Sequence, residues 1–311
     1  MKRTLFGVTL LVLSGFWGIG AAHAASKDKQ AADSPKNAAA NPADFVGTDT
    51  CATCHDEVAK GFATNPHTKM EIMPGGKGIT CENCHGAGKE HVDGGGDVTK
   101  IFRPSQASAR ETDAMCLKCH AGQHANFERS AHGKNSGCLG CHSIHEAKTD
   151  DHLLKMPQPL LCYSCHSDVK PAFSQPFHHK VNEGLMTCSD CHNPHGTFQG
   201  KALRTTADQN DICTKCHLET AGPFVYEHPV VKQEGCLSCH NPHGSANARM
   251  MNVASVNQLC IRCHTGTNAA AFPNAKPLPS GPSHDLSKTY VSCTTCHSQI
   301  HGSNSAYNFF K

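Results

Sequence analysis

Apolar residues form one long run at the start of the chain and are thinly scattered elsewhere. Lys2 and Arg3 precede the run, which begins at Leu5, and the small-residue site AHA ends at Ala24. This order predicts a secretory signal peptide over residues 1–24, cleaved after Ala24. A membrane anchor is the alternative interpretation, but the run is short for a span and no stop-transfer pattern follows it.

The rest of the chain is poor in apolar residues. Residues 25–45 are mainly Ala, Lys, Asp, Asn and Pro, which predicts a flexible leader before one domain over residues 46–311. No other apolar run is long enough to cross a membrane as a helix, so the mature protein is expected to be soluble or to enter a membrane only inside a partner. The hydrophobic fraction of 38% and the aromatic fraction of 6% are low for 311 residues. We therefore expect something other than side chains to fill the core.

The charge balance gives no sign of a nucleic-acid partner. Without Lys2 and Arg3, the 28 basic residues fall to 26, which equals the number of acidic residues. The mature polypeptide is therefore formally neutral, and it has no basic patch of the kind that binds nucleic acid.

Every cysteine belongs to a Cys-x-x-Cys pair that is followed directly by histidine. In the C-x-x-C-H motif, two thiols bond covalently to haem vinyl groups and the adjacent imidazole ligates the iron from one face. A disulfide framework and zinc sites are the alternatives, but neither needs a histidine after every pair. The predicted attachment residues are Cys51, Cys54, Cys81, Cys84, Cys116, Cys119, Cys138, Cys141, Cys162, Cys165, Cys188, Cys191, Cys213, Cys216, Cys236, Cys239, Cys260, Cys263, Cys293 and Cys296. The proximal ligands are His55, His85, His120, His142, His166, His192, His217, His240, His264 and His297.

Ten covalently bound haems c are therefore predicted, and they would supply the missing core. The expected fold is a haem-cored multihaem cytochrome c, mostly loops with short α-helices and little or no β structure, in an elongated chain of ten haems. The motifs group into five two-haem units at about 51–91, 116–145, 162–195, 213–243 and 260–301.

Each unit also contains two further histidines that suit the opposite face of an iron. These predicted distal ligands are His67, His91, His132, His145, His179, His195, His228, His243, His284 and His301. His284 is the weakest assignment, because it lies in a Pro- and Gly-rich stretch. His124, His152 and His178 have no assigned role, although His178 is an alternative to its neighbour His179. Met70 and Met73 are alternative ligands, and packing around a haem is the favoured interpretation for both.

Chain length limits which iron a nearby histidine can reach. Two imidazoles on one iron place their Cα atoms about 13 Å apart, whereas three extended residues span at most about 11 Å. His195 should therefore not share an iron with His192 and should serve a neighbouring haem, most simply the one at Cys162 or at Cys213. The working hypothesis is exchange within a unit, in which His195 caps the haem of His166 and His179 caps that of His192.

Ten candidate distal ligands for ten haems indicate an electron carrier without catalytic residues. A multihaem reductase of nitrogen or sulfur oxyanions, with one open iron position, is the less favoured alternative.

Longer strings surround several motifs: CENCHGAGKEH at 81, MTCSDCHNPHG at 186, Glu227-His228-Pro229 before GCLSCHNPHGS, and CTTCHSQIHGSN at 293. On these strings the chain resembles one family, the MtrA/DmsE-type periplasmic decahaem cytochromes c, which include PioA-like proteins. The resemblance implies bis-histidine haems and a periplasmic protein associated with the outer membrane. Its implied partners are an outer-membrane β-barrel porin, periplasmic or inner-membrane cytochromes, and an outer-surface multihaem cytochrome. It leaves open the direction of electron flow, and a freely diffusing periplasmic shuttle is the alternative. Histidine placement from Thr265 to Ser292 departs from the family pattern.

Overall fold

The computed structural model describes residues 41–69, 78–149, 151–205, 208–264 and 292–310. The predicted signal peptide, most of the predicted leader, Met70, Met73 and His284 lie outside these ranges.

Short helices separated by loops make up the described chain. The α-helices are α1 (Thr48–Ala52), α2 (Asp56–Ala63), α3 (Cys81–His85), α4 (Lys89–Asp93), α5 (Ala109–His120), α6 (Ala131–Asn135), α7 (Leu160–Tyr163), α8 (Cys188–Cys191), α9 (Asn210–Thr214), α10 (Pro229–Gln233) and α11 (Val256–Ile261). The 3-10 helices are Pro42–Asp44, Pro66–Lys69, Val98–Lys100, Phe127–Arg129, Cys138–Gly140, Asp151–Leu153, Ala172–Ser174, Gly200–Ala202, Leu218–Thr220, Cys236–Ser238, Ala248–Met250 and Cys293–Thr295. Strands β1 (Tyr226–Glu227) and β2 (Gly302–Ser303) pair antiparallel, with Tyr226 opposite Ser303.

The longest helix, α5, has a clear start signal in the sequence. The Ser108 hydroxyl accepts a hydrogen bond from the Glu111 backbone N–H, and the Glu111 carboxylate accepts one from the Ser108 backbone N–H at 2.9 Å. This capping box satisfies two backbone donors that would otherwise lack partners. The helix ends at His120, so it presents the whole motif Cys116–His120 in its last two turns.

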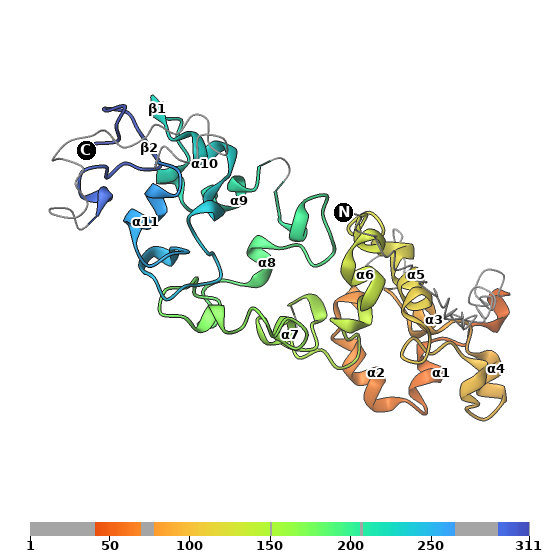
Figure 1. Ribbon diagram of the computed structural model, residues 1–311. Coiled ribbons are helices and arrows are strands. Elements are labelled where there is room, and N and C mark those ends of the chain that lie inside the picture. Colours follow the sequence, from red (N-terminus) through yellow and green to blue (C-terminus); the bar gives the residue numbers. More distant parts are fainter. Residues whose placement is uncertain (1–40, 70–77, 150, 206–207, 265–291, 311) are drawn as a thin grey trace, which may run out of the picture.

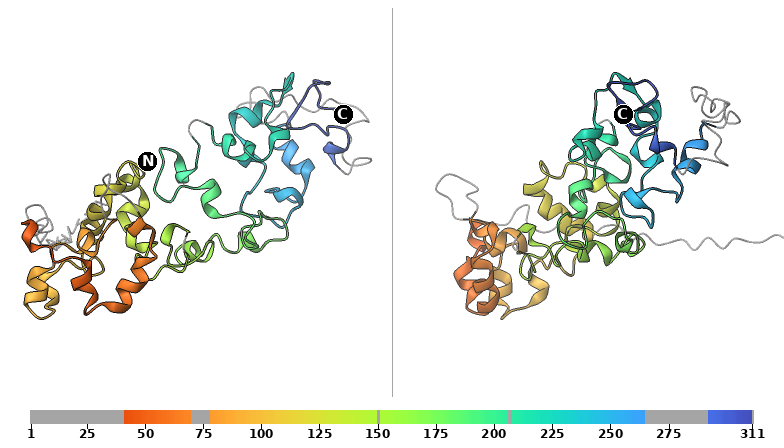
Figure 2. Two further views of the ribbon diagram at one scale, coloured as in Figure 1. Left: turned by 180° about the vertical axis from the view of Figure 1, so that it is seen from behind. Right: turned by 90° about the vertical axis from the view of Figure 1, so that its left-hand side faces the viewer.

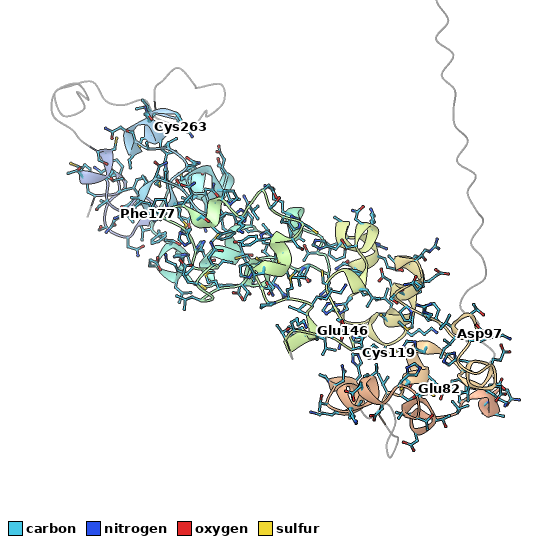
Figure 3. All side chains as sticks on the ribbon, turned by 90° about the horizontal axis from the view of Figure 1, so that it is seen from below. Glu82, Asp97, Cys119, Glu146, Phe177 and Cys263 are labelled. Atoms are coloured by element: carbon cyan, nitrogen blue, oxygen red, sulfur yellow. The ribbon has the colours of Figure 1, made fainter. Side chains whose placement is uncertain are left out.

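The described chain forms an elongated body. In Figure 1 the segment with α1–α5 lies at one end, α7 and α8 lie in the middle, and α11 and β2 lie at the other end. The two further views in Figure 2 show the same progression, and Figure 3 shows Glu82 and Cys119 at the end opposite Cys263. None of the described helices has the length and apolar character needed to cross a membrane.

Few apolar side chains are buried among the described residues. The buried hydrophobic residues are Phe62, Phe127, Tyr163, Phe173 and Val181. Tyr163, Phe173 and Val181 form one small apolar cluster. The chain also surrounds a cavity of about 4090 Å³, lined by cysteines and histidines of the motifs from Cys51 to Cys260. The predicted fold class, mostly loops with short helices and little β structure, is confirmed.

Candidate haem sites

Each motif folds as a single helical turn. The backbone N–H of the motif histidine donates to the carbonyl of the first cysteine, for example from His192 to Cys188 at 3.0 Å and from His217 to Cys213 at 3.0 Å. Residues three and four positions apart lie on the same face of a helix. The turn therefore directs both thiols and the imidazole of a motif to one side, as a covalently bound haem requires.

The first cysteines of the two motifs in a unit lie next to each other. A hydrogen bond from the Cys162 thiol lowers the pKa of Cys188 to about 7, and one from Cys213 does the same for Cys236. Equivalent contacts join Cys51 to Cys81, Cys116 to Cys138 and Cys260 to Cys293. The two attachment sites of each unit are therefore adjacent.

Neighbouring units also meet through cysteines. Burial raises the pKa of Cys141, and the nearby Cys165 of the next unit raises it further. Burial also raises the pKa of Cys263, and Glu234 and then Cys239 of the preceding unit add to this effect. Cys84 likewise lies within electrostatic range of Cys119, and Cys191 within range of Cys216. The motifs therefore follow one another in space in the order of the sequence.

The described distal histidines each face a proximal histidine. Two imidazoles on opposite faces of one metal ion have ring centres about 6 Å apart, given about 2 Å per metal–nitrogen bond and ~1.1 Å from each nitrogen to its ring centre. The ring centres lie at this separation in nine pairs. These are His55 and His91 (6.3 Å), His85 and His145 (6.1 Å), His120 and His67 (6.1 Å), His142 and His195 (6.0 Å), His166 and His132 (5.9 Å), His192 and His243 (6.2 Å), His217 and His179 (6.2 Å), His240 and His301 (6.3 Å), and His264 and His228 (6.5 Å).

The pairing corrects the expected exchange within units. His195 does not face His192, in agreement with the reach argument, but it also does not face His166 or His217; it faces His142. His179 faces His217 rather than His192. Eight of the nine pairs join neighbouring predicted units, and His55 with His91 is the pair inside one unit.

Close backbone packing explains why His195 reaches back to the preceding unit. Gly196, at φ +92°, lies so near the preceding unit that a Cβ there would be 2.9 Å from the Asn126 carbonyl oxygen and 2.8 Å from Ser130 Cβ. Gly244 approaches the Ala172 carbonyl in the same way. Glycine has no Cβ and tolerates positive φ, so it permits this contact.

Hydrogen bonds orient the imidazoles for metal binding. Nine predicted ligands hold Nδ1 within hydrogen-bond distance of a backbone carbonyl oxygen: His85, His91, His132, His142, His179, His192, His228, His240 and His297. A carbonyl only accepts, so Nδ1 carries the hydrogen and Nε2 keeps its lone pair. Histidines that bind metals commonly donate their other ring N–H to a carbonyl in this way.

Where two units meet, each contributes a distal histidine that faces a proximal histidine of the other, and these two distal histidines are also linked. His132 donates from Nδ1 to the carbonyl of Pro194 at 2.8 Å, and the next residue is His195. His179 bonds the Pro242 carbonyl before His243, and His228 bonds the Ile300 carbonyl before His301. Each link fixes one distal ligand against the backbone of the other.

Between the first two units, the buried side chain of Asn65 replaces the direct hydrogen bond from imidazole to carbonyl. His67 Nδ1 lies 2.9 Å from Asn65 Oδ1, and Asn65 Nδ2 donates to the Ile144 carbonyl at 2.8 Å. Ile144 precedes His145, so Asn65 connects the same two ligand positions. Asn65 belongs to none of the sequence motifs, so its role is visible only in the fold.

Left-handed loops supply the carbonyls for three proximal histidines. His142, His192 and His240 bond the carbonyls of His152, Lys201 and Arg249 at 2.7, 2.8 and 2.9 Å. The three acceptor residues have φ of 57° to 58°, a conformation that costs a non-glycine residue roughly 1–2 kcal/mol. Backbone strain of this kind commonly occurs at functional sites, and here it aims an acceptor at each imidazole.

Burial favours the neutral form that binds metal in six of the predicted distal histidines. It lowers the pKa of His195 to about 4 and lowers the pKa of five others below the usual value. These five are His67, His145, His228, His243 and His301.

The three unassigned histidines have other surroundings. Both ring nitrogens of His178 are hydrogen-bonded, Nδ1 to the Gln175 carbonyl at 2.5 Å and Nε2 to Glu183 at 2.9 Å. His152 supplies the carbonyl for His142. The His124 ring centre lies 3.8 Å from that of His195, and its buried Nδ1 has no hydrogen-bond partner among the described residues.

The donor set fits haem c. One-turn motifs present two thiols and an imidazole, facing imidazoles are spaced for one metal ion, and the motifs line a shared cavity of about 4090 Å³. The motifs bind haem covalently.

Comparisons with known proteins agree with this chemistry. The family model "Doubled CXXCH motif" matches residues 131–171, 178–222 and 228–269, and "Cytochrome c554 and c-prime" matches residues 16–86. Each doubled-motif segment contains the second motif of one predicted unit and the first motif of the next.

Two curated relatives and one solved structure are similar to the chain. The multiheme cytochrome MtrA of Shewanella baltica is 35% identical over 269 residues, which cover 83% of this chain and 79% of that protein. The cytochrome c-type protein NrfB of Escherichia coli is 29% identical over 129 residues, covering 38% of this chain and 64% of that protein. The undecaheme cytochrome from the S-layer of Carboxydothermus ferrireducens matches 78% of this chain and 34% of its own, with 21% identity and a TM-score of 0.15.

Proposed function

Since this chain belongs to the MtrA-like family of multihaem c-type cytochromes, which are electron-transfer proteins, we propose that it is a periplasmic decahaem electron conduit. It would pass electrons between periplasmic or inner-membrane cytochromes and an outer-surface multihaem cytochrome, through an outer-membrane β-barrel porin. Anaerobic extracellular respiration and iron oxidation are the processes that such a conduit serves.

The order of the motifs is the observation that carries this proposal. Consecutive motifs lie next to each other in sequence order through their cysteines, from Cys51 and Cys81 to Cys260 and Cys293. The described chain is elongated, so this order leads from one end of the molecule to the other (Figure 1). A compact store of electrons does not need a linear order, whereas a conduit does.

We assign the twenty motif cysteines to covalent attachment and the ten motif histidines to the proximal iron positions. The distal ligands in this proposal are the nine facing histidines and His284, which serves His297. When bound, haem c supplies reversible one-electron chemistry. The chain contributes ligand orientation through the Nδ1 bonds, and its prolyl and left-handed backbone segments hold neighbouring sites at fixed spacing.

Two ligands at every iron distinguish the carrier from a reductase. We expect the purified holoprotein to contain ten haems, all low spin. Haem content measured as the pyridine haemochrome, with electron paramagnetic resonance of the oxidised protein, checks both points. A substantial high-spin ferric signal, or turnover of nitrite or tetrathionate, would support the reductase instead.

Copurification tests the porin partner and the location. Outer membranes of the native host, solubilised in mild detergent, should yield the tagged chain together with a heat-modifiable β-barrel protein. Recovery of the chain only as a monomer in the periplasmic fraction would favour the freely diffusing shuttle.

A pair of adjacent histidines gives a direct test of the ligand assignment. We expect His179→Ala to convert one haem in ten to high spin, because His179 faces His217 at 6.2 Å. His178→Ala is the matched control and should leave all haems low spin, because both ring nitrogens of His178 are bonded elsewhere. Absorbance in the high-spin charge-transfer region measures the difference, and equal spectra for the two variants would refute the assignment.

A further inference from the structure

A polar residue three positions before a first cysteine holds the second motif of its unit. Asp113 Oδ1 accepts a hydrogen bond from the backbone N–H of Cys138 at 2.7 Å. Asn210 Oδ1 accepts one from Cys236 at 2.9 Å, and Asn257 Oδ1 accepts one from Cys293 at 2.8 Å. Three of the five predicted units therefore share one contact, with a carboxylate in one and an amide in two.

The surroundings of Asp113 and Asn210 match closely. Asp113 is 7% exposed and Asn210 is 8% exposed. Each packs against a glycine at positive φ, and a Cβ on Gly137 would lie 3.1 Å from Asp113 Oδ1, whereas one on Gly235 would lie 2.8 Å from Asn210 Oδ1. Asn210 also donates from Nδ2 to the Val231 carbonyl at 2.7 Å, and its backbone N–H donates to Asp208 at 2.8 Å. The two positions therefore share the acceptor oxygen and differ in charge and in these bonds.

The charge of Asp113 is poorly compensated. In the described part of the chain, Asp113 accepts hydrogen bonds from Cys138 alone, and no basic side chain forms an ion pair with it. The other buried carboxylate, Glu82, accepts three backbone N–H bonds. A buried charge that lacks close partners acts strongly on its surroundings, because the local dielectric is low.

On the basis of the proposed haem assignment, we propose that Asp113 lowers the reduction potential of the two haems of its unit. Its buried carboxylate makes the haem sites at Cys116–His120 and Cys138–His142 harder to reduce than the sites at Cys213–His217 and Cys236–His240, where Asn210 occupies the same position.

The physical reason is that reduction adds one electron to a site beside a fixed negative charge. Charge and hydrogen bonding near a haem are established determinants of its potential. Before haem is attached, the Cys138 thiol responds to the carboxylate in the same sense: the hydrogen bond with Cys116 and burial raise its pKa, and the hydrogen bond and charge of Asp113 raise it further. Deprotonation and reduction both add negative charge, so Asp113 disfavours both.

Reciprocal substitutions in the holoprotein test the inference. Asp113→Asn keeps the acceptor oxygen and removes the charge, and Asn210→Asp adds the charge at the matching site. In a spectroelectrochemical titration of the α-band, we expect Asp113→Asn to move about two-tenths of the amplitude to higher potential. The expected size is about a tenfold change in the ratio of reduced to oxidised haem at a fixed potential, which is about 59 mV for one electron. Asn210→Asp should move about two-tenths of the amplitude in the opposite direction.

Haem content and spin state separate this inference from the proposed function. Titrations of both variants that overlay the parent curve, with ten low-spin haems retained, would overturn the role of Asp113 alone. If Asp113→Asn lowers haem content, Asn210→Asp and Asn257→Asp decide the question, because each introduces the charge without removing an acceptor. Fewer than ten haems in the parent protein would instead contradict the proposed function.

Discussion

Replacing His195 by alanine is expected to convert one haem in ten from low spin to high spin, at the site of His142. The ring centres of His195 and His142 are 6.0 Å apart, and the rings lie 13° from parallel. Removing the imidazole opens that iron position to water or to an added ligand. Because the remaining nine sites keep both histidines, electron paramagnetic resonance should show about one-tenth of the iron as high spin.

His124 must be removed in the same experiment. Its ring centre lies 3.8 Å from that of His195, so it is close enough to occupy the vacated position. We therefore expect the double variant His124→Ala/His195→Ala to be high spin at one site even if the single variant stays low spin. His124→Ala alone is the control and should remain fully low spin.

Removing individual haems identifies the iron that His195 serves. Combining the double variant with Cys138→Ala and Cys141→Ala should abolish the high-spin signal, because the affected haem is then absent. Combining it with Cys162→Ala and Cys165→Ala should leave the signal in place. The opposite result would support the exchange within a unit, in which His195 serves the haem of His166. If a haem-deficient variant fails to fold, a crystal structure of the double-variant holoprotein would show which iron has the empty position.

Local chemistry was predictable from the sequence because it depends on neighbouring residues. The spacing Cys188, Cys191, His192 fits one helical turn, and a single turn needs no tertiary contact to bring these groups together. Nine of the histidines predicted as distal ligands lie in the described chain, and each faces a motif histidine in the structure.

The partners of the distal histidines were not predictable from chain length. Chain length gives only an upper limit on the distance that His195 can span. It excluded the iron bound by His192 as a partner of His195, and it left several other irons possible. The choice of His142 depends on contact between Gly196 and the Asn126–Ser130 backbone, which lies more than sixty residues away in the sequence. Only the folded chain shows such a contact.

The hydrogen bonds that orient the imidazoles could not be predicted from the sequence either, because their acceptors are backbone carbonyls. The Pro194 carbonyl accepts the His132 hydrogen bond, and nothing in the sequence marks that carbonyl as an acceptor. Lys201 and Arg249 have side chains that give no sign of a left-handed backbone. A signal did exist for Asp113, Asn210 and Asn257, which share the position three residues before a first cysteine.

Replacing Glu82 by alanine is expected to destabilise the first haem site more than any exposed substitution near it. Glu82 is 4% exposed and accepts backbone N–H bonds from Val46 at 3.0 Å, Gly47 at 2.9 Å and Gly88 at 2.8 Å. Gly47 is the N-cap of α1 and Gly88 is the N-cap of α4. The carboxylate therefore fixes the two helices that lead to His55 and His91.

Three backbone donors lose their acceptor in Glu82→Ala; the bond from Gly88 is buried and those from Val46 and Gly47 are part-buried. An unsatisfied buried donor costs about 1–3 kcal/mol, so we expect a loss of about 2 kcal/mol in local stability, measured as faster hydrogen exchange of the α1 and α4 amides in the holoprotein. Glu90→Ala is the matched control, because Glu90 lies on α4 with a side chain 74% exposed and its only described ion pair, with Lys100, spans 3.8 Å. Equal exchange rates in the two variants would show that α1 and α4 are held by their haem ligands instead, since the carboxylate would then contribute no more than an exposed charge.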